Sequence, residues 1–299
     1  MLMKLWRFAS LYGIGRDINR LPYLEGQNLQ QMMNLKEIGL IFPTLLDILQ
    51  IKSPPNHFIE NVWFAHKECC EYEDPKSLST LKGRYLKIKG NYLQSYRYFD
   101  NYKTEIRNIF KCGKTIEESN KDFTEKLFAN DTKSFKLCAH FRRDEFLENE
   151  MLESKEDFIY PALDYALEYL KSATKIDNKI SLIFIGDDYL FAKNLSIKNG
   201  FHKIYIFEPQ SRGEDMCLGI NYCDSLILTA SGSAFGWWIS YLMKENSTIF
   251  YNSKIGKNGK SKKDIYDFDI FPKEWIKLSV NKNGKAKTEE KWWREKIHF

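Results

Sequence analysis

Two adjacent arginines follow a short apolar segment near the middle of the 299-residue chain. The stretch from Leu137 to Phe146 contains His140, Arg142 and Arg143 and continues with two carboxylates. A guanidinium offers a rigid fork of N–H donors and stays charged in any surroundings, which suits a phosphorylated ligand. The competing interpretation is a solvated basic patch whose arginines form only surface ion pairs.

Two further polar clusters also follow apolar runs that we predict to be strands. The acidic cluster Gly186-Asp187-Asp188 comes directly after residues 179–185. The third cluster comes after residues 225–229, at the start of a predicted helix, and contains Ser231, Ser233, Ala234 and Phe235. In open α/β sheets ligands bind outside the carboxyl ends of the strands, and a helix start offers N–H groups to an anion. The three clusters together suit a sugar nucleotide, although Gly-Asp-Asp alone is often only a turn.

The C-terminal half must position these clusters, and in it apolar runs alternate with helical patterns. We predict strands at 179–185, 203–207, 225–229 and within 244–251, and helices at 162–170, 216–222 and 235–243, with Pro161 in the first turn of its helix. This alternation predicts a doubly wound parallel sheet. The charged stretch 111–134 is the predicted crossing between domains. The predicted domains are residues 1–133, residues 134–280 and a charged tail at 281–299.

Composition narrows the function classes. The net charge of +5 is mild and the lysines are scattered, which disfavours nucleic acid as a partner but allows an anionic small ligand. No run approaches the roughly 18 apolar residues of a membrane span. The six cysteines lack the paired spacing of a zinc site, so up to three disulfides or none are compatible with the sequence.

Six stretches, in chain order, resemble the motifs of the α-1,2-fucosyltransferase family, glycosyltransferase family 11. They are Leu5 to Ile14, Gly90 to Arg107, His140-Phe141-Arg142-Arg143, Asp187-Asp188, the block from Asp215 to Phe235-Gly236-Trp237-Trp238, and Phe271 to Ile276. The resemblance implies an α/β, GT-B-like fold with two Rossmann-type lobes and parallel sheets. It also implies inverting, metal-independent transfer of L-fucose from GDP-fucose to a galactoside hydroxyl in α-1,2 linkage.

The resemblance also implies partners and locations. GDP-fucose is the expected donor substrate, with no separate cofactor, and a β-galactoside-terminated glycan is the expected acceptor. Residues 1–133 form the expected acceptor-side lobe, and residues 134–280 form the expected lobe for the GDP-sugar. The implied location is the Golgi lumen or membrane, through an anchor that this chain lacks.

Site roles follow from the same resemblance. Arg142 is the expected catalytic residue, because donors aimed at the departing diphosphate lower the barrier to transfer most. The expected donor-binding residues are His140, Arg143, Asp187, Asp188, Ser231, Ser233, Ala234 and Phe235. Either aspartate would hold the guanine or the ribose. Trp237 and Trp238 are expected in the core rather than as a platform for a sugar.

The chain departs from the family pattern in two places. The family motif continues His-x-Arg-Arg-Gly-Asp, whereas Asp144 and Glu145 follow the arginines here. The glycine-rich turn that precedes the family's first helix has no counterpart, so the chain resembles an N-terminally truncated member. The alternative function is therefore a relative that binds GDP-sugar or glycan without efficient transfer. Asp267-Phe268-Asp269 resembles a divalent-ion motif of another glycosyltransferase class, but we predict no metal site there.

Overall fold

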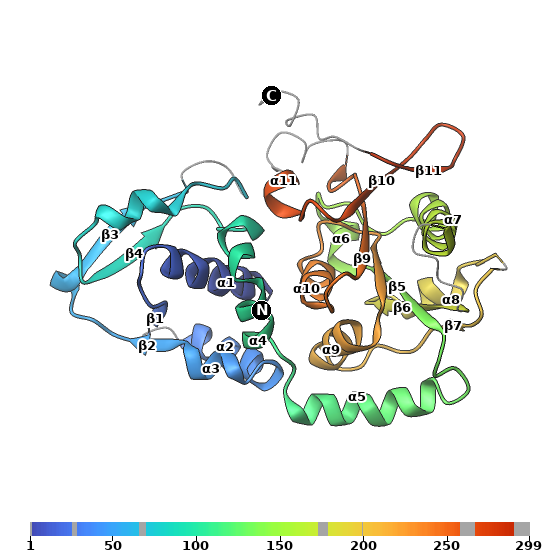
Figure 1. The fold of residues 1–299 in the computed structure, drawn as a ribbon, viewed down its shortest axis with the longest axis horizontal. Coiled ribbons are helices and arrows are strands. Elements are labelled where there is room, and N and C mark those ends of the chain that lie inside the picture. The colour runs from blue at the N-terminus through green and yellow to red at the C-terminus, as the bar shows by residue number, and fades with distance from the viewer. Residues whose placement is uncertain are drawn as a thin grey trace. The chain divides into compact units, whose positions relative to one another are not determined.

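The computed structural model describes residues 2–25, 29–65, 70–172, 179–198, 200–257 and 267–289. The chain forms two compact units (Figure 1). Unit 1 is Met1–Gly113 with Asp264–Pro272, and unit 2 is Lys114–Lys263 with Lys273–Phe299. No helix in the described parts of the chain is long and apolar enough to cross a bilayer.

Unit 1 consists of short elements around helix α1 (Leu2–Asp17), whose apolar face is buried. Gly13 lets this helix approach the chain closely, because a Cβ there would lie 1.9 Å from the Tyr98 carbonyl oxygen. Two parallel strand pairs, β1 with β2 and β3 with β4, form separate two-stranded sheets. The other elements are β1 (Tyr23–Glu25), α2 (Leu29–Ile41), α3 (Thr44–Ile48), β2 (Gln50–Lys52), η1 (Asn56–Phe58), β3 (Ile59–Trp63), η2 (Pro75–Thr80), β4 (Tyr85–Lys89), η3 (Tyr96–Tyr98), η4 (Asp100–Tyr102), α4 (Lys103–Ile109) and α11 (Asp267–Ile270).

Unit 2 is built on a seven-stranded sheet in the order β11-β10-β9-β8-β5-β6-β7, parallel except for β11. Its strands are β5 (Phe135–Phe141), β6 (Ile180–Gly186), β7 (Ile204–Tyr205), β8 (Ser225–Leu228), β9 (Thr248–Asn252), β10 (Ile276–Val280) and β11 (Ala286–Thr288). Its helices are α5 (Lys114–Leu127), α6 (Asp144–Glu148), α7 (Glu156–Ser172), α8 (Tyr189–Asn194), α9 (Arg212–Tyr222) and α10 (Ala234–Leu242).

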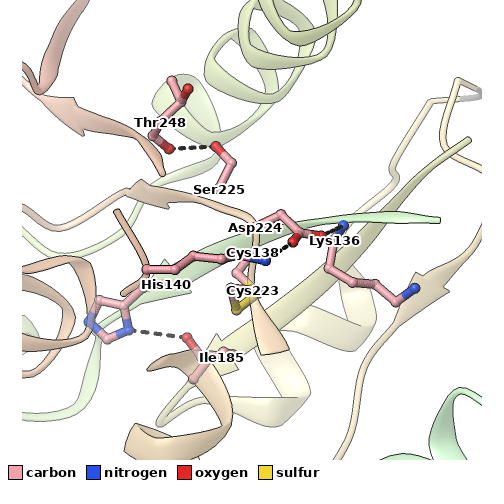
Figure 2. The surroundings of a disulfide bond; sticks show 9 residues. Lys136, Cys138, His140, Ile185, Cys223, Asp224, Ser225 and Thr248 are labelled. Atoms are coloured by element: carbon pink, nitrogen blue, oxygen red, sulfur yellow. Dashed lines mark hydrogen bonds and ion pairs between the residues drawn. A yellow bond between two sulfur atoms is a disulfide. The ribbon is translucent and has the colours of Figure 1, made fainter. Parts of the chain in front are cut away.

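Strand β5 shows how alternation divides the core of unit 2 between two faces of the sheet. Leu137, Ala139 and Phe141 pack in the same apolar cluster as residues of α7. Lys136, Cys138 and His140 alternate with them and therefore lie on the opposite face. Figure 2 shows this second row, in which Cys138 forms a disulfide with Cys223 at the end of α9. Cys70, Cys112 and Cys217 are also disulfide-bonded.

The structure confirms the strands and helices predicted for the C-terminal half and shows three further details. The chain passes from unit 1 to unit 2 between Gly113 and Lys114, within the charged stretch 111–134, and most of that stretch is the helix α5. Pro161 lies inside α7 rather than in its first turn, because the helix already begins at Glu156. Phe158 and Ile159 are buried and stabilise this earlier turn, although Pro161 has no N–H to donate to it. Strand β11 lies within the predicted tail 281–299 and pairs with β10.

Candidate active site at the carboxyl edge of the sheet

The three polar clusters lie at one edge of the sheet of unit 2. Strand β5 pairs with β6 on one side and with β8 on the other, so their carboxyl ends lie next to each other. Helix α7, the longer of the two helices between β5 and β6, packs against one face of the sheet. Helix α10, which follows β8, packs on the opposite face, because a Cβ at Gly236 would overlap the His140 ring. Adjacent strands that send their helices to opposite faces create a crevice where α/β proteins bind ligands.

Arg142, directly after β5, holds its guanidinium between two carboxylates. Its Nη1 lies 2.8 Å from Asp187 Oδ2, and its Nη2 lies 3.2 Å from Glu145 Oε2. The Asp187 side chain is 13% exposed, whereas that of Glu145 is 77% exposed. Asp187 Oδ2 is buried and accepts no well-directed hydrogen bond. The guanidinium is thus partly exposed, at 27%, and one of its two partners is a solvated, weakly held carboxylate.

Arg143 makes more contacts with the protein than Arg142 does. Its backbone N–H donates to Asp187 Oδ1 at 2.9 Å, and its Nε donates to Asp188 Oδ2 at 3.0 Å. Its Nη1 donates to the Ser154 carbonyl at 2.8 Å, and the guanidinium lies 3.9 Å from the centre of the Phe191 ring. Burial raises the pKa of Asp187, while the Arg143 N–H and the charge of Arg142 oppose that rise. Arg143 and the two aspartates therefore form a fixed frame beside Arg142.

His140 is 1% exposed, and both of its ring nitrogens have partners within the protein. A carbonyl oxygen can only accept, so Nδ1 carries the proton and donates to the Ile185 carbonyl at 3.2 Å. Nε2 then accepts from the Ser233 hydroxyl at 2.9 Å. Burial lowers the pKa of His140 to about 4, against the opposing effect of the Ile185 carbonyl. The neutral ring thereby ties β5 to the loop that begins α10.

The first turn of α10 provides N–H groups at the same edge. Ser233 is its N-cap, and the Ser233 hydroxyl accepts from the Gly236 N–H at 3.4 Å. The N–H groups of Ala234 and Phe235 occupy the first two helical positions, which have no partner inside a helix. Both residues are only partly buried. This helix start can bind an anion through two N–H groups and the positive end of the helix dipole.

Three polar residues outside the predicted set connect the clusters. Ser154 is fully buried, accepts from the Arg142 N–H at 2.9 Å and lies 2.6 Å from the Thr229 hydroxyl. Thr229 donates in turn to the His140 carbonyl at 2.8 Å. Ser231, which we predicted to bind the donor, instead donates to the Asn252 carbonyl at 2.7 Å. Thr229 directly follows the apolar strand β8, and Asn252 is the last residue of β9. This position at a strand end could have identified both as site residues from the sequence, whereas Ser154 has no such signal.

A further buried acid lies after β7. Asp215 accepts from the Gln210 N–H at 3.1 Å, and burial raises the pKa of Asp215 to about 6. The side-chain nitrogen of Gln210 is buried and has no hydrogen-bond partner. Buried polar groups normally find partners. Gln210, in the loop that leads into α9, therefore has a polar group without a partner beside Asp215, which lies in the first turn of that helix.

Asp267-Phe268-Asp269 forms the short helix α11 in unit 1. Asp269 is buried and pairs with Arg97 at 2.8 Å, and it also accepts from the Tyr72 N–H at 2.9 Å. Within the described residues no three His, Cys, Asp or Glu side chains gather in a way that could hold a metal ion. Asp269 therefore helps to hold unit 1 together through an ion pair whose carboxylate is buried. Trp237 and Trp238 are buried, as the sequence predicts.

Known proteins resemble this chain in both sequence and fold. The model of glycosyl transferase family 11 matches residues 27–279. A galactoside 2-alpha-L-fucosyltransferase from Caenorhabditis elegans is 24% identical over 307 residues, which cover 94% of this chain and 75% of that protein. A second C. elegans protein of the same name is 26% identical over 291 residues, which cover 94% of this chain and 77% of that one.

The structure of Arabidopsis thaliana FUT1, an Arg-to-Lys variant in complex with GDP, gives a TM-score of 0.51 at 11% identity. The match covers 91% of this chain and 72% of that one. The family match makes the chain a glycosyltransferase by class, and the predicted α/β, GT-B-like fold is confirmed. The chain belongs to glycosyl transferase family 11.

Proposed function

We propose that this protein transfers L-fucose from GDP-fucose to a galactoside hydroxyl, in α-1,2 linkage and with inversion at the sugar. Membership of glycosyl transferase family 11 supports a glycosyl transfer, and the two C. elegans relatives carry galactoside 2-alpha-L-fucosyltransferase as their name. The acceptor is a glycan that ends in β-galactose. Residues 1–133 would bind this acceptor, and residues 134–280 would bind the donor.

The observation that carries the proposal is the placement of Arg142. In the reaction, the bond from fucose C1 to the β-phosphate oxygen breaks, C1 bonds to the acceptor oxygen, and the acceptor hydroxyl loses its proton. Negative charge then grows on the departing GDP, and fixed positive groups aimed at it lower the barrier. Arg142 lies at the carboxyl edge, partly exposed, directly after β5, which is the neighbour of the strand that leads into α10. We assign it the catalytic role of stabilising the diphosphate.

The remaining residues divide into contacts and supports. Ala234 and Phe235 would bind a phosphate through their N–H groups, with Ser233 capping that turn. Arg143 with Asp187 and Asp188 would fix Arg142, and one of the aspartates would accept from the guanine or ribose. His140 and Ser231 hold the loops in place, because their polar atoms bind protein partners.

We further propose that the transfer needs no metal, because arginine can stabilise the leaving phosphate in place of a divalent ion. GDP-fucose is then a substrate, and no separate cofactor takes part. The proposed compartment is the Golgi lumen. The disulfide between Cys138 and Cys223 supports an oxidising compartment of this kind.

Transfer is tested by incubating the purified protein with GDP-fucose and phenyl β-D-galactoside in EDTA, with GDP release and product linkage as the readouts. We expect chelator-insensitive GDP release and a product fucosylated at O2. Arg142→Gln should abolish turnover. Arg16→Gln, which loses a surface ion pair with Glu105 and a contact with the Tyr102 ring, should leave it unchanged. A fucosylated product linked at another hydroxyl would overturn the α-1,2 assignment, and full activity of Arg142→Gln would overturn the catalytic role.

A second function, donor binding without efficient transfer, is favoured by the ion pair between Glu145 and Arg142. This carboxylate competes with a phosphate for the same guanidinium. Calorimetry separates the two functions, because GDP binding with no turnover would support the second one. Recovery of turnover in Glu145→Gln would identify that pair as the cause.

A further inference from the structure

Three sequons for asparagine-linked glycosylation, Asn-x-Ser or Asn-x-Thr, lie outside the candidate active site. They begin at Asn130, Asn194 and Asn246, and none has proline in the middle. All three belong to unit 2. A sequon accepts a glycan when its asparagine is accessible in a secreted or luminal protein. The surroundings of each asparagine therefore decide whether the sequon can be used.

The first sequon is held by its middle residue. Asp131 is 5% exposed, and its carboxylate accepts hydrogen bonds from Ser181 and Tyr205. Asn130 and Thr132, on either side of it, are exposed. The buried carboxylate thus fixes this segment with the asparagine and the threonine of the sequon both in solvent.

The second sequon follows the same arrangement at the end of α8. Leu195 is 8% exposed, belongs to the apolar cluster that includes α7, and has an extended backbone. Asn194 and Ser196 are exposed. Because alternate residues of an extended segment point to the same side, Asn194 and Ser196 face solvent together.

The third sequon lies in the turn between α10 and β9. Asn246 is exposed and has a φ of 63°, and Thr248 is the half-buried first residue of β9. The Ser247 hydroxyl between them is buried. Asparagine tolerates a positive φ better than most residues, so Asn246 also suits the turn by itself. This sequon is therefore best tested by changing Thr248, which leaves that asparagine in place.

The side-chain amides of the three asparagines are available for a bond to a sugar. Other asparagines in unit 2 use theirs within the protein, since Nδ2 of Asn120 and Nδ2 of Asn252 donate to backbone carbonyls. In the part of the chain that the structure describes, the amides of Asn130, Asn194 and Asn246 make no such hydrogen bond. A glycan on these nitrogen atoms would therefore break no contact of the described fold.

The cysteines indicate a compartment in which asparagine-linked glycans are added. Cys138 and Cys223 form a buried disulfide in unit 2 (Figure 2), and Cys70, Cys112 and Cys217 are also disulfide-bonded. Disulfides persist in the lumen of the endoplasmic reticulum and in secreted proteins, but they are rare in the cytosol. The disulfides and the exposed sequons thus agree on one kind of compartment.

Two of the sequons lie at the edge of the sheet opposite the candidate active site. Asn130 precedes β5 and Asn246 precedes β9, and both strands run parallel to β8, so both asparagines lie near amino ends. The seven residues of β5 separate its two ends by about 23 Å, and Arg142 follows the carboxyl end. Glycans at Asn130 and Asn246 would therefore leave the carboxyl edge open to a ligand.

We infer that unit 2 carries asparagine-linked glycans at Asn130, Asn194 and Asn246. In this modification Nδ2 of the asparagine bonds to C1 of an oligosaccharide that is carried on a lipid pyrophosphate. The bond from C1 to the pyrophosphate oxygen breaks, the lipid pyrophosphate leaves, and the amide nitrogen loses one proton. The modification rests on the luminal compartment proposed above and is independent of fucosyl transfer.

The test uses the full chain purified, without reduction, from the organism that produces it. Enzymatic release of the glycans in heavy-oxygen water converts each glycosylated asparagine to a labelled aspartate, which mass spectrometry detects. We expect label at Asn130, Asn194 and Asn246 and none at Asn149, which is exposed but is not part of a sequon.

The same digest reports the state of Cys138 and Cys223. Unlabelled asparagines in a protein with this disulfide would overturn the inference and leave the proposed compartment in place. Unlabelled asparagines together with free thiols would overturn both. Fucosyl transfer is assayed on the same samples, so failure of the proposed reaction is distinguishable from failure of the modification.

Variants of the hydroxyl residues locate the glycans without removing an asparagine. The full chain is secreted from insect cells behind a cleavable signal peptide. Thr132→Val, Ser196→Ala and Thr248→Val should each lose one glycan, whereas the matched controls Thr132→Ser, Ser196→Thr and Thr248→Ser should keep it. A glycan count that is unchanged by all three hydroxyl-free variants would overturn the assignment to these sequons.

Discussion

Strand β5 carries a buried lysine near its amino end and an arginine just past its carboxyl end, and the two cations have different surroundings. Lys136 lies in a network around Asp131, and Arg142 lies beside Asp187. Both aspartates are largely buried, and both have a cation within 4 Å. The two ends differ in how completely the carboxylate is hydrogen-bonded.

At the amino end one oxygen of the carboxylate accepts several hydrogen bonds. Asp131 Oδ2 accepts hydrogen bonds from Ser134, Ser181 and Tyr205, and Lys136 Nζ lies 3.4 Å away. Burial alone would raise the pKa of Asp131, but these three hydrogen bonds and the lysine outweigh burial and lower it. Such a network fixes the ends of the neighbouring strands.

At the carboxyl end the hydrogen bonding is incomplete. Asp187 Oδ2 accepts no directed hydrogen bond, burial raises the pKa of Asp187, and one partner of Arg142 is the solvated Glu145. The ionised form of Asp187 is therefore less stabilised than that of Asp131, because Asp187 has fewer hydrogen-bond partners. The comparison indicates that the amino end serves stability and the carboxyl end serves binding.

The largest effect that would test this contrast comes from Arg142→Ala. We expect kcat/KM for fucosyl transfer to fall on the order of 10⁴-fold, about 5 kcal/mol, because the departing diphosphate loses its arginine. The free energy of unfolding in urea should change by no more than about 1 kcal/mol, as expected for a partly exposed ion pair. A variant that loses stability but keeps its activity would reverse the two roles.

The matching change at the amino end is Asp131→Asn. It leaves the buried Lys136 without its counter-charge, and we expect the free energy of unfolding to fall by about 4 kcal/mol. The dissociation constant for GDP should stay the same in the folded protein. Urea unfolding and calorimetry measure the two quantities, and a loss below about 1 kcal/mol would show that the network is dispensable.

His140 lies on the same face of β5 as Lys136, and we expect it to make the stability of the protein depend on pH. Its pKa is about 4 in the folded protein and 6.5 in the unfolded chain, so the unfolded state binds the proton first as the pH falls. Stability should therefore decrease from pH 6.5 to pH 4, by about 3 kcal/mol. The original protein and His140→Gln contain the same carboxylates. The difference between their free energies of unfolding in urea, measured across this pH range, therefore isolates the effect of His140. A difference that is independent of pH would contradict the buried, neutral ring.

The smallest effect is expected at Glu145. Replacing it with Gln removes a solvated competitor of the phosphate for Arg142, and GDP affinity should rise about threefold at low salt, with less change at high salt. Asp164→Asn, which removes a surface pair with Lys198, serves as the control in the same titrations. Weaker binding by Glu145→Gln would mean that this carboxylate orients Arg142 instead of competing for it.

The sequence predicted the shared edge because it depends only on strand order. Apolar runs before Arg142, Asp187 and Thr229 imply parallel strands, whose carboxyl ends meet at one edge. Burial of His140 also follows from alternation, since it lies on the same face as Cys138.

Contacts between distant parts of the chain could not be predicted in this way. Ser154 follows an irregular loop, and only folding brings its hydroxyl within 2.6 Å of that of Thr229, 75 residues away. The pairing of Asp269 with Arg97, which lies 172 residues earlier, is another such contact. Local patterns carry no information about such pairs, whereas they do determine strands and helices.

Calorimetric titration of GDP into the protein and into Arg142→Gln tests the central claim most directly, namely that the carboxyl end of β5 binds the diphosphate of the donor. We predict that the dissociation constant rises at least 100-fold in the variant, while Lys136→Met, at the amino end, binds GDP like the original protein for as long as it stays folded. Equal GDP affinity of Arg142→Gln and the original protein would contradict the account.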